Sequence, residues 1–184
     1  EPLFMVMATQ NPLEQEGTYP LPEAQLDRFL FKIVLQYPSL EEEVEITRRA
    51  RRAYEGHVEA GVQALFQPAD LLKLREQLNA IHIDERIERF AVELVAATRN
   101  LGDYIPEWSD HLRAGASPRA SISLLRASTA RAALRGRDYV LPEDIITLAP
   151  DTLRHRIQLN FSARAEGVSE EALIAGLIDV LPAP

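Results

Sequence analysis

The sequence predicts a mainly α-helical protein whose first 37 residues form the end of an α/β domain. Two apolar runs, at residues 3–8 and 29–35, have the composition of strands that are buried on both faces of a parallel sheet. Two such strands cannot bury themselves, and the remaining sequence offers mostly helical patterns. We therefore expect a domain boundary near residue 37 and a helical domain over residues 38–184. The alternative is a small local sheet that the later helices cover.

Length and composition exclude several classes of function. The chain of 184 residues is long enough for a hydrophobic core, and it contains no cysteine, which excludes disulfides, thiolate metal sites and a cysteine nucleophile. A formal charge of −8 argues against general binding to nucleic acids or anionic membranes. No apolar run reaches the roughly 18 residues of a transmembrane helix, and no signal peptide is visible. We expect a cytoplasmic protein.

The segment between the two apolar runs predicts a loop and a short helix. Three prolines and Gly17 punctuate residues 9–22, as in an irregular loop. A short helical segment over about residues 23–27 then leads to Arg28 and the second apolar run.

Start signals mark most of the predicted helices. Ser39 and Glu42 fit a capping box, Asp84 and Ser169 fit N-caps, and Ser117 is an N-cap hydroxyl followed by proline. We expect Pro150 to interrupt one helix, and the apolar pieces at residues 62–65 and 80–83 to pair as a small β element. The predicted helices cover residues 40–54, 68–79, 84–101, 117–135, 142–149, 151–157 and 169–181.

Charge is segregated along this acidic chain. Residues 111–137 contain no Asp or Glu and six arginines, which suggests a specific anionic partner. Arg119 falls at the second position of the helix that Ser117 begins, where a cation opposes the macrodipole by a few tenths of a kcal/mol. A phosphate bound at that helix end would reverse the sign of this effect. The alternative is an exposed arginine that bends into solvent.

A complete catalytic site is absent from the sequence. The glycine-rich motif of phosphate-cleaving P-loop enzymes and the acidic magnesium ligand after an apolar strand are both missing. The four histidines share no metal-ligand spacing, and no Ser/His/Asp constellation is legible.

Residues 4–29, which run from Phe4 through Asn11-Pro12 to Asp27-Arg28-Phe29, closely resemble the MoxR family of AAA+ ATPases. Residues 115–120 and 134–140 resemble the helical lid of that family, and residues 153–157 resemble a motif near its end. The resemblance implies a helical AAA+ lid domain, residues 38–184, preceded by the last strands of a truncated α/β P-loop ATPase core, residues 1–37. Walker A and Walker B, which hold the nucleotide in the family, are not in this sequence.

The resemblance assigns roles to three residues. Asn11 matches sensor 1, whose amide would contact the γ-phosphate or the attacking water; without the resemblance it reads as an Asn-Pro turn. Arg28 matches the arginine finger that reaches the neighbouring subunit's nucleotide, and its alternative is an ion pair with Asp27 or Glu23. Arg119 matches sensor 2, a lid arginine that contacts the γ-phosphate of its own subunit. The resemblance thus makes all three catalytic, with Asn11 and Arg119 also binding ATP.

The same resemblance implies a ring, typically a hexamer, with ATP at each subunit interface and magnesium ligands outside this chain. ATP hydrolysis would drive chaperone-like remodelling or maturation of client proteins or metalloenzyme complexes, often with a partner that carries a von Willebrand factor A domain. No nucleic acid or membrane is implied, and the chain alone would be inactive. The alternative is a non-catalytic helical module that scaffolds a partner; a helical nucleic-acid-binding domain is a distant third.

Overall fold

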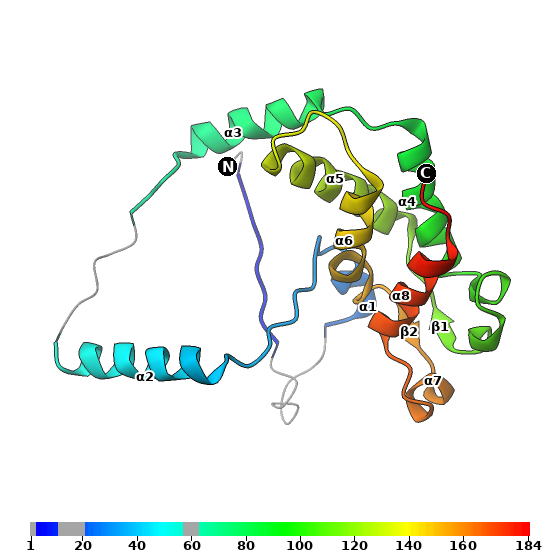
Figure 1. Ribbon diagram of the computed structural model, residues 1–184, viewed down its shortest axis with the longest axis horizontal. Helices are drawn as coiled ribbons and strands as arrows, with labels where there is room; N and C mark the ends of the chain where they lie inside the picture. The colour runs from blue at the N-terminus through cyan, green and yellow to red at the C-terminus, as the bar shows by residue number, and fades with distance from the viewer. Residues whose placement is uncertain (1–2, 11–20, 57–62) are drawn as a thin grey trace.

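The computed structural model describes residues 3–10, 21–56 and 63–184, and the described chain is mainly α-helical (Figure 1). Three short 3₁₀ helices, η1 (Leu78–Ala80), η2 (Leu101–Asp103) and η3 (Pro106–Trp108), connect the longer elements. The α-helices are α1 (Glu23–Leu26), α2 (Leu40–Tyr54), α3 (Pro68–Gln77), α4 (Glu85–Ala97), α5 (Pro118–Leu134), α6 (Pro142–Leu153), α7 (Phe161–Ala165) and α8 (Glu170–Val180).

The predicted start signals form real caps. Ser39 accepts a hydrogen bond from the backbone N–H of Glu42, whose carboxylate accepts one from the N–H of Ser39, so α2 begins with a capping box. Asp84, Ser117 and Ser169 each accept a bond from a backbone N–H of the helix that follows. Local sequence therefore decides where these helices begin.

The hydrophobic core lies among α4, α5, α6 and α8, which form the compact part of Figure 1. Complete burial of a Leu or Ile side chain contributes about 1.5–3 kcal/mol, so this packing holds the four helices together. Helices α2 and α3 contain no buried residue, and Figure 1 shows α2 apart from the compact part. The largest fully buried apolar side chains are those of Leu94, Leu124, Ile145, Leu153, Leu173, Ile174 and Leu177.

The described chain also contains one two-stranded antiparallel sheet. Strands β1 (Leu112–Ala114) and β2 (Gln158–Leu159) pair Leu112 with Leu159. The sequence pattern did not predict them, because strands of two and three residues are too short for a visible alternation.

The predicted pairing of residues 80–83 with residues 62–65 is wrong. His82 instead forms a β-bridge with Tyr139. The N–H of His82 donates to the carbonyl of Asp138 at 2.7 Å, and the carbonyl of His82 accepts from the N–H of Val140 at 3.0 Å. Residues 63–65 have no regular structure, and residue 62 lies outside the described residues.

The apolar runs at residues 3–8 and 29–35 are not strands, so this part of the prediction is wrong. A strand needs neighbours for its backbone N–H and C=O groups, and no other described segment pairs with either run. Phe4 is 86% exposed, which also rules out the alternative of a local sheet covered by the later helices.

The interruption predicted at Pro150 is also wrong. Helix α6 continues through Pro150 to Leu153, and the chain then turns at Arg154–Arg156 instead of forming a helix to Ile157. Proline removes one backbone hydrogen bond, but Ile145, Ala149 and Leu153 are fully buried along this helix, and their packing outweighs that loss. No described helix is long and apolar enough to cross a membrane.

Candidate functional site

A single carboxylate joins three distant parts of the chain. Asp27, the residue after α1, accepts hydrogen bonds from the Ser117 hydroxyl at 3.0 Å, the Arg119 Nη1 at 2.9 Å and the Arg156 Nε at 3.0 Å. Ser117 and Arg119 begin α5, and Arg156 lies in the turn after α6. The segment that precedes Arg28 is therefore attached to the helical part through Asp27.

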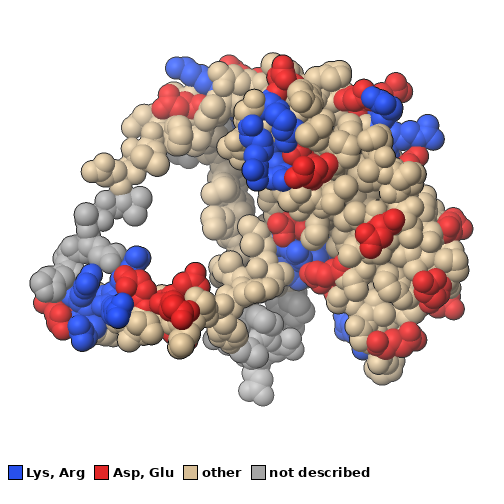
Figure 2. Space-filling model, in the orientation of Figure 1, with Lys and Arg blue, Asp and Glu red and all other residues tan. Residues whose placement is uncertain are grey.

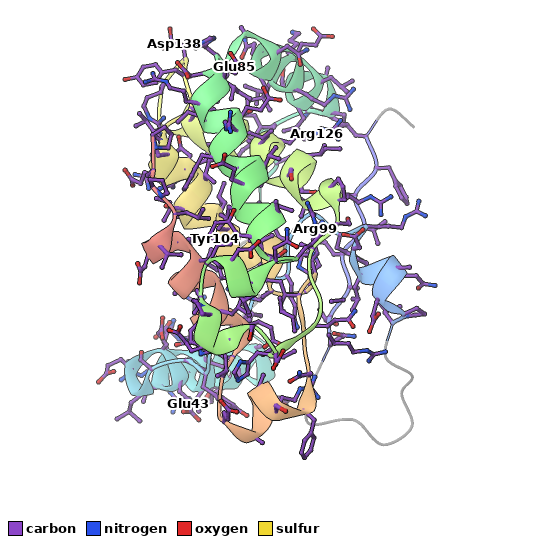
Figure 3. All side chains as sticks on the ribbon, turned by 90° about the vertical axis from the view of Figure 1, so that its right-hand side faces the viewer. Glu43, Glu85, Arg99, Tyr104, Arg126 and Asp138 are labelled. Atoms are coloured by element: carbon purple, nitrogen blue, oxygen red, sulfur yellow. The ribbon has the colours of Figure 1, made fainter. Side chains whose placement is uncertain are left out.

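The beginning of α5 is held in place by its contacts with the end of α4. The hydroxyl of Thr98 accepts the N–H of Ala116 at 2.9 Å, and Arg99 donates to the Ala116 carbonyl at 2.7 Å; Figure 3 labels Arg99. A Cβ on Gly115 would lie 2.2 Å from the carbonyl oxygen of Thr98, so only glycine allows this approach. The position of Arg119 is thus fixed by packing as well as by the Ser117 cap.

Arg156 holds the backbone of the segment that contains Arg28. Its side chain is only 1% exposed. In addition to the carboxylate of Asp27, it binds three backbone carbonyls: that of Asp27 at 3.0 Å, that of Phe29, and that of Leu30 at 3.3 Å. Its remaining partners are Ser123 on α5 and the carbonyl of Thr152. Sequence reasoning gave this arginine no role, because nothing in its spacing separates it from the other arginines.

Arg154 and His155, the two residues before Arg156, also contact the backbone of the segment that contains Arg28. The Nε2 of His155 lies 3.1 Å from the carbonyl oxygen of Phe29, and Arg154 donates to the carbonyl of Lys32 at 2.5 Å. The N–H of Lys32 donates in turn to the carbonyl of Asp151 at 2.9 Å. Residues 27–32 are therefore bound to the helical part through their backbone rather than through a sheet.

Burial and charge shift the pKa of two groups at this site. Burial raises the pKa of Asp27, but hydrogen bonds from Ser117 and Arg156 and the positive charges of Arg156 and Arg119 outweigh it and leave that pKa below its usual value. Burial, together with the charge of Arg156, lowers the pKa of His155 from 6.5 to about 4. At neutral pH Asp27 is ionised and His155 is neutral.

The structure describes two of the three predicted site residues. Arg28 is exposed and follows Asp27 directly, but within the described part of the chain it makes no ion pair with Asp27 or Glu23, which was the alternative. Arg119 has a side chain that is 54% exposed and directed at Asp27. Asn11 lies outside the described residues.

The six arginines of residues 111–137 do not form one uniform cationic surface. Arg131 and Arg137 both bind the buried carboxylate of Asp144, at 3.1 Å and 2.7 Å. Arg126, labelled in Figure 3, and Arg135 have no ion-pair partner among the described residues, and Figure 2 shows basic side chains gathered over one end of α5. Part of the positive charge is therefore neutralised within the fold.

A hollow of about 1010 Å³ runs along α5 and brings Arg28 and Arg119 to one surface. Guanidinium groups beside a helix N-terminus suit phosphate oxygens, because N–H donors from both converge on an anion. The described residues contain no group of three His, Asp or Glu side chains that could hold a metal ion. The side chains that line the hollow are those of Arg28, Leu30, Phe31, Arg119, Ile122, Ser123, Arg126, Ala127, Ala130, Arg131, Leu134, Arg135 and Leu148.

Comparison with known proteins shows which family this chain resembles. Residues 1–31 match the family described as ATPases associated with various cellular activities (AAA), and residues 109–177 match the AAA lid domain. The chain is 43% identical over 185 residues to Chaperone MoxR1 of Mycobacterium tuberculosis. It is 40% identical over 181 residues to the uncharacterized protein YeaC of Bacillus subtilis. The chain belongs to the MoxR family of AAA+ ATPases.

Both of these alignments cover 98% of the chain but only 47% of MoxR1 and 53% of YeaC, so the chain spans about half the length of the curated relatives it matches. A crystal structure of a candidate ATPase from Cytophaga hutchinsonii is 43% identical and superposes with a TM-score of 0.87, covering 95% of this chain and 52% of that one. The predicted family and the mainly helical fold with an AAA+ lid are confirmed.

Proposed function

We propose that this MoxR-type chain supplies the arginine finger and both sensors of an ATPase, working as the carboxy-terminal part of a longer protein. The observation that carries the proposal is the contact of Asp27 with Arg119, which brings the beginning of α5 next to Arg28. Both arginines line the same hollow, and both have exposed side chains. The family match to an ATPase domain over residues 1–31 and to its lid supports the same assignment.

Each residue has a separate role in this proposal. Arg119 would contact the γ-phosphate of its own subunit, together with the N-terminal end of α5. Arg28 would reach the nucleotide of the adjacent subunit and stabilise the charge that develops on the transferred phosphoryl group. Asn11 would orient the phosphate or the attacking water. Magnesium-bound ATP supplies the phosphoryl group, and the magnesium ligands would lie in the Walker motifs, outside this sequence.

The proposed assembly is a ring, hexameric in our prediction, because a finger that acts across a subunit boundary needs a neighbour. Movement of the lid relative to the nucleotide-binding part would remodel client proteins or metalloenzyme complexes. A partner with a von Willebrand factor A domain is part of the proposal. The name Chaperone MoxR1 of one relative supports a chaperone-like role.

Two single variants of the full-length protein test the proposal. We expect Arg28→Ala and Arg119→Ala each to lower magnesium-dependent ATP turnover more than tenfold, since a lost charged contact is worth about 1.5–3 kcal/mol. Arg113→Ala is the matched control, because Arg113 is exposed on β1 and lies outside the hollow. Its turnover should equal that of the unaltered protein. Unchanged turnover in Arg28→Ala and Arg119→Ala would reject the ATPase roles.

Mixing the two variants tests whether Arg28 acts across a subunit boundary. If it does, a mixed ring contains some interfaces with both an intact finger and an intact sensor, and the mixture recovers part of the turnover. A mixture no more active than the variants alone would mean that both arginines act on the nucleotide of their own subunit.

A non-catalytic scaffold is the second candidate, and the exposed apolar side chains of α2 favour it. Leu40 is 72%, Val44 41% and Ile46 55% exposed, as in a helix that binds a partner. A nucleotide titration of the full-length protein separates the two candidates. Saturable ATP binding that promotes oligomerisation supports the ATPase, whereas no binding supports the scaffold.

A further inference from the structure

Asp27 is connected to both of the arginines that are proposed to contact nucleotide. Through its side chain it contacts Arg119, and through its peptide bond it is joined to Arg28. We propose that Asp27 is a positioning residue that fixes the finger, Arg28, and the sensor, Arg119, as one rigid unit on the helical lid. This inference rests on the proposed function, because it assigns a cause to the relative placement of those two arginines.

The contact with α5 sets the direction of Arg119. Asp27 accepts from the Ser117 hydroxyl at 3.0 Å and from one nitrogen of Arg119 at 2.9 Å, so the carboxylate and the helix cap orient the same arginine. A guanidinium group has five N–H donors. Asp27 takes one of them, and the others stay available for phosphate oxygens.

The contact with Arg156 sets the position of Arg28. Arg156 binds the carboxylate of Asp27 and the backbone carbonyls on both sides of Arg28, those of Asp27 and Phe29. Arg156 is buried against α5 through Ser123 and against α6 through Thr152. The backbone of the finger is therefore attached to α5, which carries the sensor, and to α6.

A neutral amide cannot replace this carboxylate. Two oxygens of Asp27 serve three donors, whereas Asn has one acceptor oxygen and an NH₂ group that would face an arginine. Asp27 is also ionised at neutral pH, which strengthens each of its bonds to an arginine. Asp27→Asn therefore loosens both arginines together.

The first arm of the test measures ATP turnover in the full-length protein. We expect Asp27→Asn to lower kcat at least tenfold with a change in ATP KM of less than about threefold, because the substrate still binds to residues that are unaltered. Asp27→Asn should lower turnover less in the Arg119→Ala background than in the unaltered protein, since the part of its effect that acts through Arg119 is already lost there and only the part that acts through Arg28 remains. Asp27→Glu, which keeps the charge, should retain more activity than Asp27→Asn.

The matched control is Asp144→Asn. Asp144 is also a carboxylate bound by two arginines, but it lies on α6 and binds Arg131, near the other end of α5, and Arg137. Its removal lowers stability without touching Arg28 or Arg119. Combined with Arg119→Ala, its effect on turnover should multiply with that of the single variants.

The second arm needs no nucleotide. Hydrogen exchange of the Lys32 amide, which donates to the carbonyl of Asp151, reports whether residues 27–32 remain attached to the lid. We expect this amide to lose protection in Asp27→Asn and to keep it in Asp144→Asn. A general loss of stability would speed exchange of this amide in both variants. Faster exchange in Asp27→Asn alone therefore identifies a local detachment of residues 27–32.

The outcomes distinguish failure of the positioning role of Asp27 from failure of the proposed ATPase function. Normal turnover in Arg28→Ala and Arg119→Ala contradicts the proposed function. Low turnover in those two variants with normal kcat or full Lys32 protection in Asp27→Asn overturns the positioning role alone. A multiplicative effect of Asp27→Asn with Arg119→Ala also overturns it. Reduced kcat, a less than multiplicative loss in the double variant and faster Lys32 exchange together support it.

Discussion

Two apolar segments of similar composition differ in whether their backbone is bound to the rest of the described chain. Residues 3–8 are extended and leave Phe4, Met5 and Met7 at 86%, 79% and 79% exposure. In the second run, residues 29–35, the carbonyls of Phe29 and Lys32 are bound to the helical part by Arg154, His155 and Arg156, while Ile33 and Leu35 are exposed. Neither segment is a strand.

This difference shows that apolar composition marks a segment for burial but does not supply its partner. The second segment satisfies its backbone with arginine and histidine side chains, which replace the neighbouring strands of a sheet. Within the described part of the chain, the first segment has no comparable partner, and its apolar side chains face solvent. The following predictions test this contrast, beginning with the largest expected effect.

Arg156→Ala is expected to detach residues 27–32 from the helical part. The substitution removes the donor for Asp27 and for several carbonyls, and breaking a buried ion pair typically costs about 3–5 kcal/mol. Chemical denaturation of the 184-residue chain measures this change. Arg113→Ala, an exposed arginine, should change the free energy of unfolding by less than about 0.5 kcal/mol. Equal effects of the two variants would contradict the attachment.

His155 is expected to make the attachment sensitive to acid. The pKa of His155 is about 4 in the folded protein and near 6.5 when unfolded, so between these values the unfolded chain binds the additional proton. Stability therefore falls as pH drops from 6.5 to 4, by at most about 1.4 kcal/mol per pH unit for one proton. The cause is burial of the imidazole together with the positive charge of Arg156, and the buried Nδ1 has no hydrogen-bond partner among the described residues.

His155→Gln is the variant that tests this pH dependence. An amide can still donate to the carbonyl of Phe29 but does not titrate. Denaturation at pH 7 and pH 5 should show a smaller loss of stability in the variant than in the unaltered chain. An unchanged loss would assign the acid sensitivity to other groups.

Changes in the first segment are expected to have the smallest effect. Met5→Ser and Met7→Ser should alter the unfolding free energy of this chain by less than about 0.5 kcal/mol, because both side chains are already exposed. Chemical denaturation measures this as well. A loss of several kcal/mol would reveal a contact that residues 3–8 make with another part of the protein or with a second copy.

Sequence reasoning succeeded where the signal is local. Ser39, Asp84, Ser117 and Ser169 begin helices as predicted, because a cap depends on a side chain and the next three residues. The placement of Arg119 in the first turn of α5 follows from the same rule. The family was also predicted from the sequence, and it is confirmed by the relatives.

Sequence reasoning failed where the outcome depends on distant partners. The continuity of α6 through Pro150 depends on packing, and the partner of His82 is Tyr139, 57 positions along the chain. Asp27 and Arg156 are separated by 129 residues, and no spacing rule connects them. The roles of Asn11, Arg28 and Arg119 in ATP hydrolysis stay predictions.

The sequence by itself determined where most of the helices begin, their caps, the absence of Walker motifs and the family, because these depend on neighbouring residues or on matching motifs. Only the tertiary structure decided that one carboxylate meets Ser117, Arg119 and Arg156, and that residues 27–32 bind the lid through their backbone. The physical reason is that a buried charge finds partners by proximity in space. Packing of α4, α5 and α6 creates that proximity.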